Sequence, residues 1–138
     1  MSVRANERSA SQMEFINSAH ELEIFTIKLA LRENVIPKRY RYVLAKPLCE
    51  SARLINQYIT MANELIPKDS KEYKIRHAYQ RRALAEMRNY FELMRIASEI
   101  LSIKRSTLEE WTKIANKESK AMRGWIQSDS KRYESLTF

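Results

Sequence analysis

The chain is poor in the residues that interrupt helices. Its 138 residues include one glycine, Gly124, and three prolines, at positions 37, 47 and 67. Tight hairpin turns and bulges need residues that adopt positive φ cheaply, so one glycine gives little support to β-sheets. Apolar residues repeat at helical spacing between short breaks at 34–39, 67–70 and 103–106. Because short connections place neighbouring helices antiparallel, we predict an all-α, antiparallel up-down-up-down four-helix bundle.

Cysteine and long apolar runs are also scarce. The single cysteine, Cys49, excludes an internal disulfide and any multi-cysteine metal site, and we expect a small apolar core residue there. The longest uncharged run, 54–63, is far shorter than the roughly 20 residues that cross a bilayer. The N-terminus lacks the apolar segment of a signal peptide. These absences predict a cytoplasmic protein that does not associate with membranes.

The sequence predicts one domain with a flexible N-terminus over residues 1–10, the four-helix bundle over 11–126 and a C-terminal tail over 127–138. Two capping boxes, in which a serine and a glutamate three residues later satisfy free N–H groups, mark helix starts at Ser11 and Ser106. The first helix is expected to end near Glu33.

Pro47 indicates either that the regular second helix begins there, with the proline in its first turn, or that the helix is kinked. We predict a start near 40–42 with a local bend, and a third helix over about 70–103. Gly124 is expected near the end of the fourth helix.

Apolar side chains at heptad-like spacing define the expected inward faces, the pattern of nearly antiparallel helix packing. The first helix presents Phe15, Ser18, Leu22, Phe25 and Leu29. The second presents Leu44, Leu48, Ser51, Ile55, Tyr58, Ala62 and Leu65. The third presents Leu84, Met87, Phe91, Met94, Ser98 and Leu101, and the fourth presents Leu108, Trp111, Ala115, Met122 and Trp125.

The residues that most often carry catalysis or bind metals do not form a recognisable motif. His20 and His77 lack the preceding glutamate of Glu-x-x-His ligand pairs and the preceding arginine of a helical ribonuclease motif. One glycine cannot build a Gly-rich phosphate loop. We therefore expect no catalytic residues, no cofactor and no metal, and we expect both histidines to be structural or solvated.

Positive charge is abundant instead. The chain has 25 Lys and Arg against 17 Asp and Glu, a net charge of +8. Residues 70–138 carry 15 basic and 9 acidic side chains, so most of this excess lies in the second half. A strongly basic protein favours an anionic partner, with nucleic acid first and an acidic protein or a membrane surface second.

One row of cations follows the expected third helix. Lys74, Arg81, Arg88 and Arg95 recur every seventh residue and Arg82 lies beside them, with Arg76 nearby. Seven residues are close to two helical turns, so the row forms a stripe roughly 31 Å long that could neutralise successive phosphates. The alternative is a solvated face, since acids at i+4 follow Arg82, Arg88 and Arg95.

A second cluster surrounds the start of the second helix. It consists of Lys38, Arg39, Arg41 and Lys46, interleaved with Tyr40 and Tyr42. No acid occurs between positions 33 and 50, so we expect these cations to be unpaired. The tyrosines could stack on bases or could simply pack at the helix start. A third, weaker patch, Lys113, Lys117, Lys120 and Arg123, is interrupted by Glu118.

Several segments resemble the accessory variability determinant proteins, small four-helix-bundle partners of reverse transcriptase in diversity-generating retroelements. They are Val-Ile-Pro-Lys-x-x-Arg at 35–41, the long second helix as far as Ala62-Asn63, and Gly-Trp-Ile-x-Ser at 124–128. The resemblance covers about residues 13–128, and Lys46-Pro47 departs from it, since an unbroken helix start is expected there.

The resemblance implies a homopentamer with a basic surface that binds both reverse transcriptase and nucleic acid. It also implies support for template-RNA-dependent cDNA synthesis without a catalytic site. A related group, the bundle proteins of 23S rRNA intervening sequences, shares the fold. The alternative interpretation is therefore a structural or regulatory bundle whose basic surface binds an acidic protein.

Apolar residues beside the inward faces give some support for oligomerisation, because one small bundle does not readily bury all of them. They are Ile24, Ile27, Leu31, Leu54, Met61, Ile75 and Tyr79.

Overall fold

The computed structural model describes the backbone of residues 2–136 and the side chains of residues 14–136. Four long helices account for most of the chain: α1 (Ser2–Ala30), α2 (Lys46–Glu64), α3 (Ser70–Ile100) and α4 (Arg105–Arg132). Three short turns complete it: η1 (Lys38–Tyr40), η2 (Arg41–Ala45) and η3 (Glu134–Leu136). The described residues contain no strand, so the predicted all-α class is confirmed.

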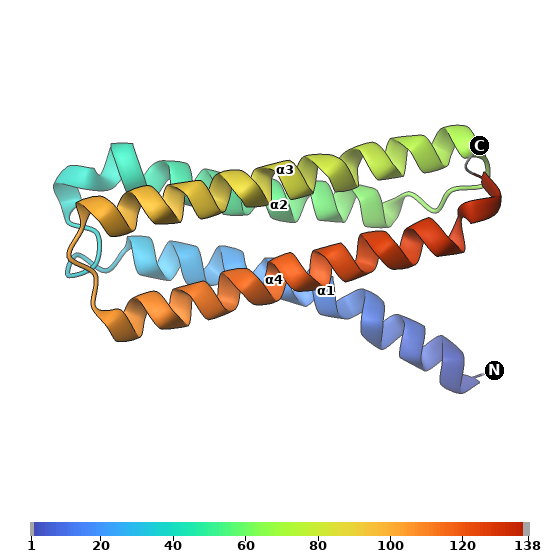
Figure 1. Ribbon diagram of the computed structural model, residues 1–138, viewed down its shortest axis with the longest axis horizontal. Helices are drawn as coiled ribbons and strands as arrows, with labels where there is room; N and C mark the ends of the chain where they lie inside the picture. Colours follow the sequence, from blue (N-terminus) through green and yellow to red (C-terminus); the bar gives the residue numbers. More distant parts are fainter. Residues whose placement is uncertain (1, 137–138) are drawn as a thin grey trace.

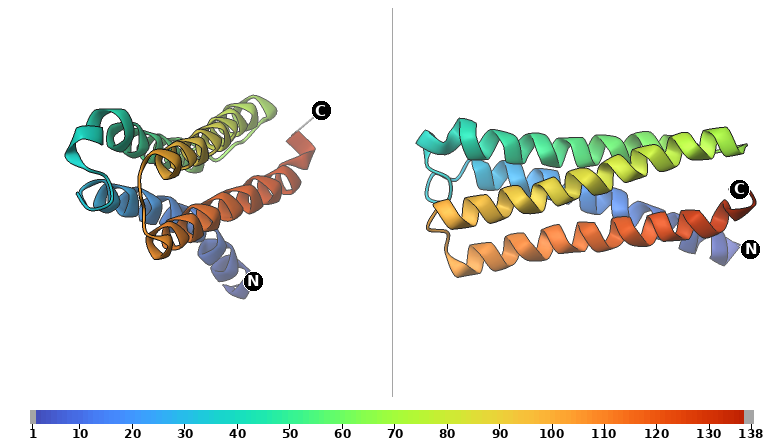
Figure 2. Two further views of the ribbon diagram at one scale, coloured as in Figure 1. Left: turned by 60° about the vertical axis from the view of Figure 1, so that its left-hand side comes forward. Right: turned by 45° about the horizontal axis from the view of Figure 1, so that its top comes forward.

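The helices form two layers. α2 packs extensively along α3, and α1 packs along α4 (Figures 1 and 2). α1 also contacts α2, whereas the contact between α3 and α4 is the smallest of the four. The N-terminal end of α1 extends away from the other helices in both figures.

α1 differs from its expected bounds at both ends. The predicted start at Ser11 is wrong, because the helix already begins at Ser2 and residues 2–10 belong to it instead of forming a flexible segment. These residues contain no glycine or proline that would end a helix. At the other end α1 stops at Ala30, and a turn follows in which the Arg32 carbonyl accepts from the Val35 and Ile36 N–H groups at 2.9 Å each.

The predicted start of the second helix near 40–42 is wrong for the regular α-helix, because α2 begins at Lys46 with Pro47 in its first turn and two irregular turns precede it. η1 is a 3₁₀ turn, and η2 is a wider π-helical turn in which the Lys46 N–H donates to the Arg41 carbonyl. Pro47 lies in the first turn of α2 and has no N–H to donate, so it cannot bond back to the carbonyl one turn earlier. The proline thus accounts for the change from the wide turn to the regular α-helix.

α3 begins at the predicted residue, Ser70. Asp69 is its N-cap, and its Oδ1 accepts a hydrogen bond of 2.8 Å from the Glu72 N–H. The helix ends at Ile100, three residues before the expected position 103.

α4 begins at Arg105, and the predicted capping box at Ser106 does not form. Lys104 occupies the N-cap position without a side-chain bond, while Glu109 pairs with Arg105 at 3.1 Å. The predicted tail from residue 127 is also wrong, because α4 continues to Arg132. Gly124 therefore lies inside the helix, eight residues before its end. The last turns of α4 are stabilised by Asp129, whose side chain is buried.

The inward faces agree largely with the predicted ones in α1, α2 and α4. In α3 the buried face lies one residue earlier than predicted at several positions, because Ala83, Tyr90 and Ala97 are buried while Leu84, Phe91 and Ser98 are half-buried. Met87, Met94 and Leu101 are buried as expected. Phe25, Tyr58, Leu65 and Leu108 are also half-buried and flank the core.

Tyr90 is the polar centre of this core. Its hydroxyl lies 2.6 Å from the Thr26 hydroxyl and accepts a hydrogen bond of 2.8 Å from Trp111 Nε1. The contact therefore joins α1, α3 and α4. Burial raises the pKa of Tyr90 to about 12, so the phenol stays neutral and keeps its donor hydrogen.

Candidate nucleic-acid interface

The 38–46 cluster, consisting of Lys38, Arg39, Arg41 and Lys46, lies on the two short turns before α2 and on its first residue. All four side chains are exposed. In Figure 1 these turns lie at the same end of the molecule as the C-terminal end of α3. The turns thus present a compact group of cations at one end of the α2–α3 layer.

The expectation that all four cations lack acidic partners is wrong for two of them. Lys38 pairs with Glu33 at 3.3 Å, and Lys46 pairs with Glu50 at 3.9 Å. The backbone turn at 31–36 and the α2 helical spacing bring these acids back to the cluster. Both pairs are exposed to solvent, and exposed ion pairs contribute little and exchange readily with other partners. Arg41 has no acidic partner among the described residues.

The two tyrosines of this segment have different environments. Tyr40 is half-buried against the core, and the Arg39 guanidinium carbon lies 5.1 Å from its ring centroid. Tyr42 is 79% exposed. Tyr40 therefore fits the packing interpretation of the sequence, whereas Tyr42 does not.

The stripe on α3 is exposed along its whole length, from Lys74 through Arg81 and Arg88 to Arg95, with Arg82 beside it. Only Arg95 has the ion pairs of a solvated helix face, at 3.6 Å from Glu92 and 3.5 Å from Glu99. The expected pairs from Arg82 and Arg88 to the acids at i+4 are absent among the described residues. Arg82 instead lies over the Tyr79 ring, 5.9 Å from its centroid.

Arg76, which the sequence places near this stripe, belongs to the interior. It is 3% exposed and forms two hydrogen bonds to Asp129, from Nε at 2.5 Å and from Nη2 at 3.0 Å. Its Nη1 donates to the carbonyls of Ala62 and Leu65, at 3.0 and 2.9 Å. The side chain thus satisfies free carbonyl groups at the end of α2 while it links α3 to α4.

This buried network includes further polar and aromatic groups. Gln80 Nε2 donates to Asp129 at 2.7 Å, and the guanidinium carbon of Arg76 lies 5.4 Å from the ring centroid of Trp125 and 5.7 Å from that of Tyr133. Burial is the main cause that raises the pKa of Tyr73, whose ring lies 5.4 Å from that of Tyr133. The network was not predicted, because position 129 was assigned to a tail.

The third basic patch is less interrupted than expected. Lys113, Lys117, Lys120 and Arg123 are all exposed on α4, whereas Glu118 is buried and contributes no charge to that surface. Burial, with a smaller contribution from Glu21, raises the pKa of Glu118 to about 9, so its carboxyl group is neutral near pH 7. Lys117 pairs with Glu21 at 3.2 Å, which leaves three cations of the patch without an acidic partner among the described residues.

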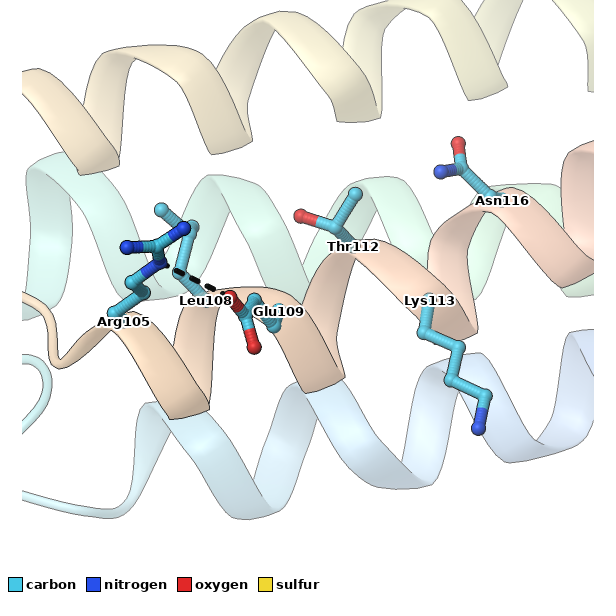
Figure 3. Close-up of a pocket in the computed structure, with 6 residues that line it drawn as sticks. All are labelled: Arg105, Leu108, Glu109, Thr112, Lys113 and Asn116. Atoms are coloured by element: carbon cyan, nitrogen blue, oxygen red, sulfur yellow. Dashed lines mark hydrogen bonds and ion pairs between the residues drawn. The ribbon is translucent and has the colours of Figure 1, made fainter.

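A shallow open groove lies along the first half of α4 (Figure 3). It is lined by Arg105, Leu108, Glu109, Thr112, Lys113 and Asn116, all from one helix. The Arg105–Glu109 ion pair lies within it. Because a single helix face encloses little space, this groove does not resemble the site of a small-molecule enzyme.

The histidines lie on α1 and α3, and the cysteine lies on α2. His20 is exposed, and the ring of His77 stacks on Tyr73 with centroids 5.8 Å apart. Cys49 is half-buried, and burial raises the pKa of its thiol. Among the described residues no group of three His, Cys, Asp or Glu side chains could hold a metal ion.

The fold and surface define an all-helical protein of four long helices with three groups of exposed cations. Compared with known proteins, the chain matches no family model, no curated protein and no solved structure. Of the helices described, none is sufficiently long and apolar to span a bilayer. Functional inference therefore depends on the surface itself.

Proposed function

We propose that this chain is an antiparallel up-down-up-down four-helix bundle that binds nucleic acid without catalysing a reaction. It acts in the cytoplasm as an accessory to a reverse transcriptase and supports template-RNA-dependent cDNA synthesis in a diversity-generating retroelement. The arrangement in Figure 1, where the chain reverses direction between successive helices, supports the bundle topology. The sequence segments that resemble the accessory variability determinant proteins support the polymerase partner.

One observation carries the nucleic-acid function. Lys74, Arg81 and Arg88 are exposed at two-turn intervals, and none has an acidic partner among the described residues. On a helix face that contacts only water, acids at i+3 or i+4 can pair with the cations and stabilise the helix slightly, as they do at Arg95. Unpaired cations at regular spacing instead suit a polyanion, whose phosphates displace counterions when they bind.

The proposal includes a homo-oligomer, and the resemblance favours a pentamer. Three apolar side chains are exposed near the connection between α2 and α3, namely Met61, Ile66 and Ile75, and we propose that they form one apolar patch there. Ile24 and Leu31 are exposed on and just after α1. Apolar groups of this kind are typical of surfaces that associate with another protein chain.

Charge removal from the stripe tests the proposal. We expect Arg81→Gln with Arg88→Gln to weaken binding of single-stranded RNA and of duplex DNA alike, because phosphate contacts do not read bases. The slope of log affinity against log salt should fall by roughly one unit per contact removed. Fluorescence anisotropy at several salt concentrations measures both quantities.

A matched control removes the same charge elsewhere. Arg53 and Arg105 are exposed cations paired with acids, at 3.5 Å from Glu23 and 3.1 Å from Glu109. Arg53→Gln with Arg105→Gln should leave affinity and salt slope close to those of the wild type. If both double variants lose the same affinity, the loss reflects only the lower net charge and not a contact made by the stripe. Unchanged binding in the stripe variant would favour an acidic protein as the partner.

The 38–46 cluster is tested in the same way. Lys38→Ala with Arg39→Ala and Arg41→Ala should also lower affinity and flatten the salt slope, and in an oligomer the effect multiplies because each subunit repeats the cluster. Co-purification with the reverse transcriptase tests the polymerase partner separately. If the chain binds nucleic acid but does not co-purify with the reverse transcriptase, only the proposed polymerase partner is overturned.

A further inference from the structure

Tyr42 is the most exposed of the large apolar side chains in the described part of the chain, with 79% of its surface accessible. It has no hydrogen bond or ring contact among the described residues. The other six tyrosines are buried or half-buried. An aromatic ring held almost entirely in water contributes nothing to the core, so packing does not explain this residue.

The backbone holds Tyr42 on an irregular turn. It is the second residue of η2, the π-helical turn closed by the Lys46 N–H and the Arg41 carbonyl just before Pro47. π turns within helices are rare and occur frequently at functional sites. The well-packed neighbours Leu44 and Ala45 anchor the same turn in the core. The ring is therefore presented to solvent from a fixed point.

Cations surround the position of this ring along the chain. Lys38 and Arg39 lie on η1 just before its turn, and Lys46 follows that turn as the first residue of α2. Arg41 immediately precedes it and has no acidic partner among the described residues. The acids that pair with Lys38 and Lys46 do so in exposed, exchangeable contacts.

We propose that Tyr42 is a stacking platform for an unpaired base of single-stranded nucleic acid, whose phosphates bind the cations of the 38–46 cluster. An exposed aromatic ring between cations is the combination that single-strand-binding proteins use, because every base has a π face. Bases inside a duplex are already stacked on both sides and cannot use the ring. The inference rests on the proposed function and adds a preference for single strands over duplex.

Binding of a labelled 20-nucleotide single strand and of the duplex of the same sequence tests this with the full chain. Tyr42→Ala should weaken single-strand binding by roughly 5- to 100-fold, the range for loss of one stacked base. It should leave duplex affinity and both salt slopes unchanged, since no phosphate contact is lost. Tyr42→Trp should keep or strengthen single-strand binding.

Val43→Ala is the matched control, because Val43 is an exposed apolar neighbour in the same turn but has no π face. It should bind like the wild type. The inference is overturned if Tyr42→Ala binds single strands normally, or loses single-strand and duplex binding equally. It is also overturned if Tyr42→Ala and Val43→Ala both reduce the mass of the assembly in light scattering, which would assign this surface to a second copy. A wild-type chain that binds neither nucleic acid would overturn the proposed function together with this inference.

Discussion

Glu118 is a carboxylic acid in the interior of the molecule. Neither of its carboxyl oxygens has a hydrogen-bond partner among the described residues, and the side chain is fully buried. Burial, with a smaller contribution from the nearby Glu21, raises its pKa to about 9, and Lys117 opposes this shift. An uncompensated carboxylate in that position would cost several kcal/mol, so the folded protein holds the proton instead.

This pKa predicts a pH dependence of stability with a definite sign. The folded carboxyl keeps its proton up to about pH 9, whereas the unfolded one loses it near its ordinary value of 4.5. Between these values the folded state binds more protons, so this group lowers the free energy of unfolding as pH rises, by on the order of 1 kcal/mol per pH unit. Glu118→Gln removes the titration, so the gain in stability over the wild type should grow from pH 5 to pH 8.

Urea denaturation of both proteins at several pH values measures this difference. The two free energies of unfolding are subtracted because the net charge of +8 gives the stability of each protein a further pH dependence, which largely cancels in the difference. Glu109→Gln, at an exposed position on the same helix, should behave like the wild type. Parallel stability curves for wild type and Glu118→Gln would contradict the buried neutral acid.

The course of α4 shows what the sequence could reveal about a helix and what it could not. Trp111, Ala115, Met122 and Trp125 were predicted to face inward and are buried. The same spacing of four and three residues continues through Glu118 and Asp129. Acidic residues are usually exposed, so only the spacing, and not the residue type, indicates that these two face inward. Asp129 is buried because Arg76 and Gln80, 53 and 49 residues away, bind its carboxylate. No local pattern contains that information.

α3 shows a different limit. Its large apolar residues Leu84 and Phe91 predicted the inward face, whereas the structure buries the small residues Ala83 and Ala97. The larger neighbours Leu84 and Phe91 are half-buried and pack against the core. Tyr90 is buried although it is polar, because Thr26 and Trp111 bind its hydroxyl. Contacts from other helices thus decide the exact rotation of α3.

The last turns of α4 depend on the Arg76–Asp129 pair. We expect Asp129→Asn to lower the free energy of unfolding by about 3–5 kcal/mol, because the Arg76 guanidinium then remains buried without a counter-charge. Arg76→Met with Asp129→Leu should recover much of this loss, since no buried charge remains. Urea denaturation checks both variants. The exposed Arg105–Glu109 pair is the control, and its removal should change stability little. A similarly small effect of Asp129→Asn would show that residues 127–132 form the tail the sequence predicted.

Exposed cations and exposed apolar side chains each occur in more than one region of the surface. Cations follow α3, the turns before α2 and the solvent side of α4, while apolar side chains are exposed around the connection between α2 and α3 and also on the turn before α2, at Tyr42 and Val43. The overall class and the exposure of the basic residues could be anticipated from composition and spacing, except for Arg76, which is buried. Which cations have acidic partners could not, because the turn at 31–36 determines the Lys38 pair.

The apolar patch of Met61, Ile66 and Ile75 leads to a prediction about assembly. Met61 and Ile75 lie on the two helices that the α2–α3 connection joins, and Ile66 lies on the connection. Burial of such side chains against another subunit stabilises an oligomer, at roughly 25 cal/mol for each Å² removed from water. We expect the wild type to form a pentamer in light scattering at micromolar concentration, and Met61→Gln with Ile75→Gln to shift it towards the 16.4 kDa monomer. Arg105→Gln, on the solvent side of α4, should leave the assembly intact. If the wild type is a stable monomer, the homo-oligomer is removed from the proposed function. If the double variant still forms the oligomer, the interface between subunits lies elsewhere. Ile24 and Leu31, which are also exposed, are then the next positions to change.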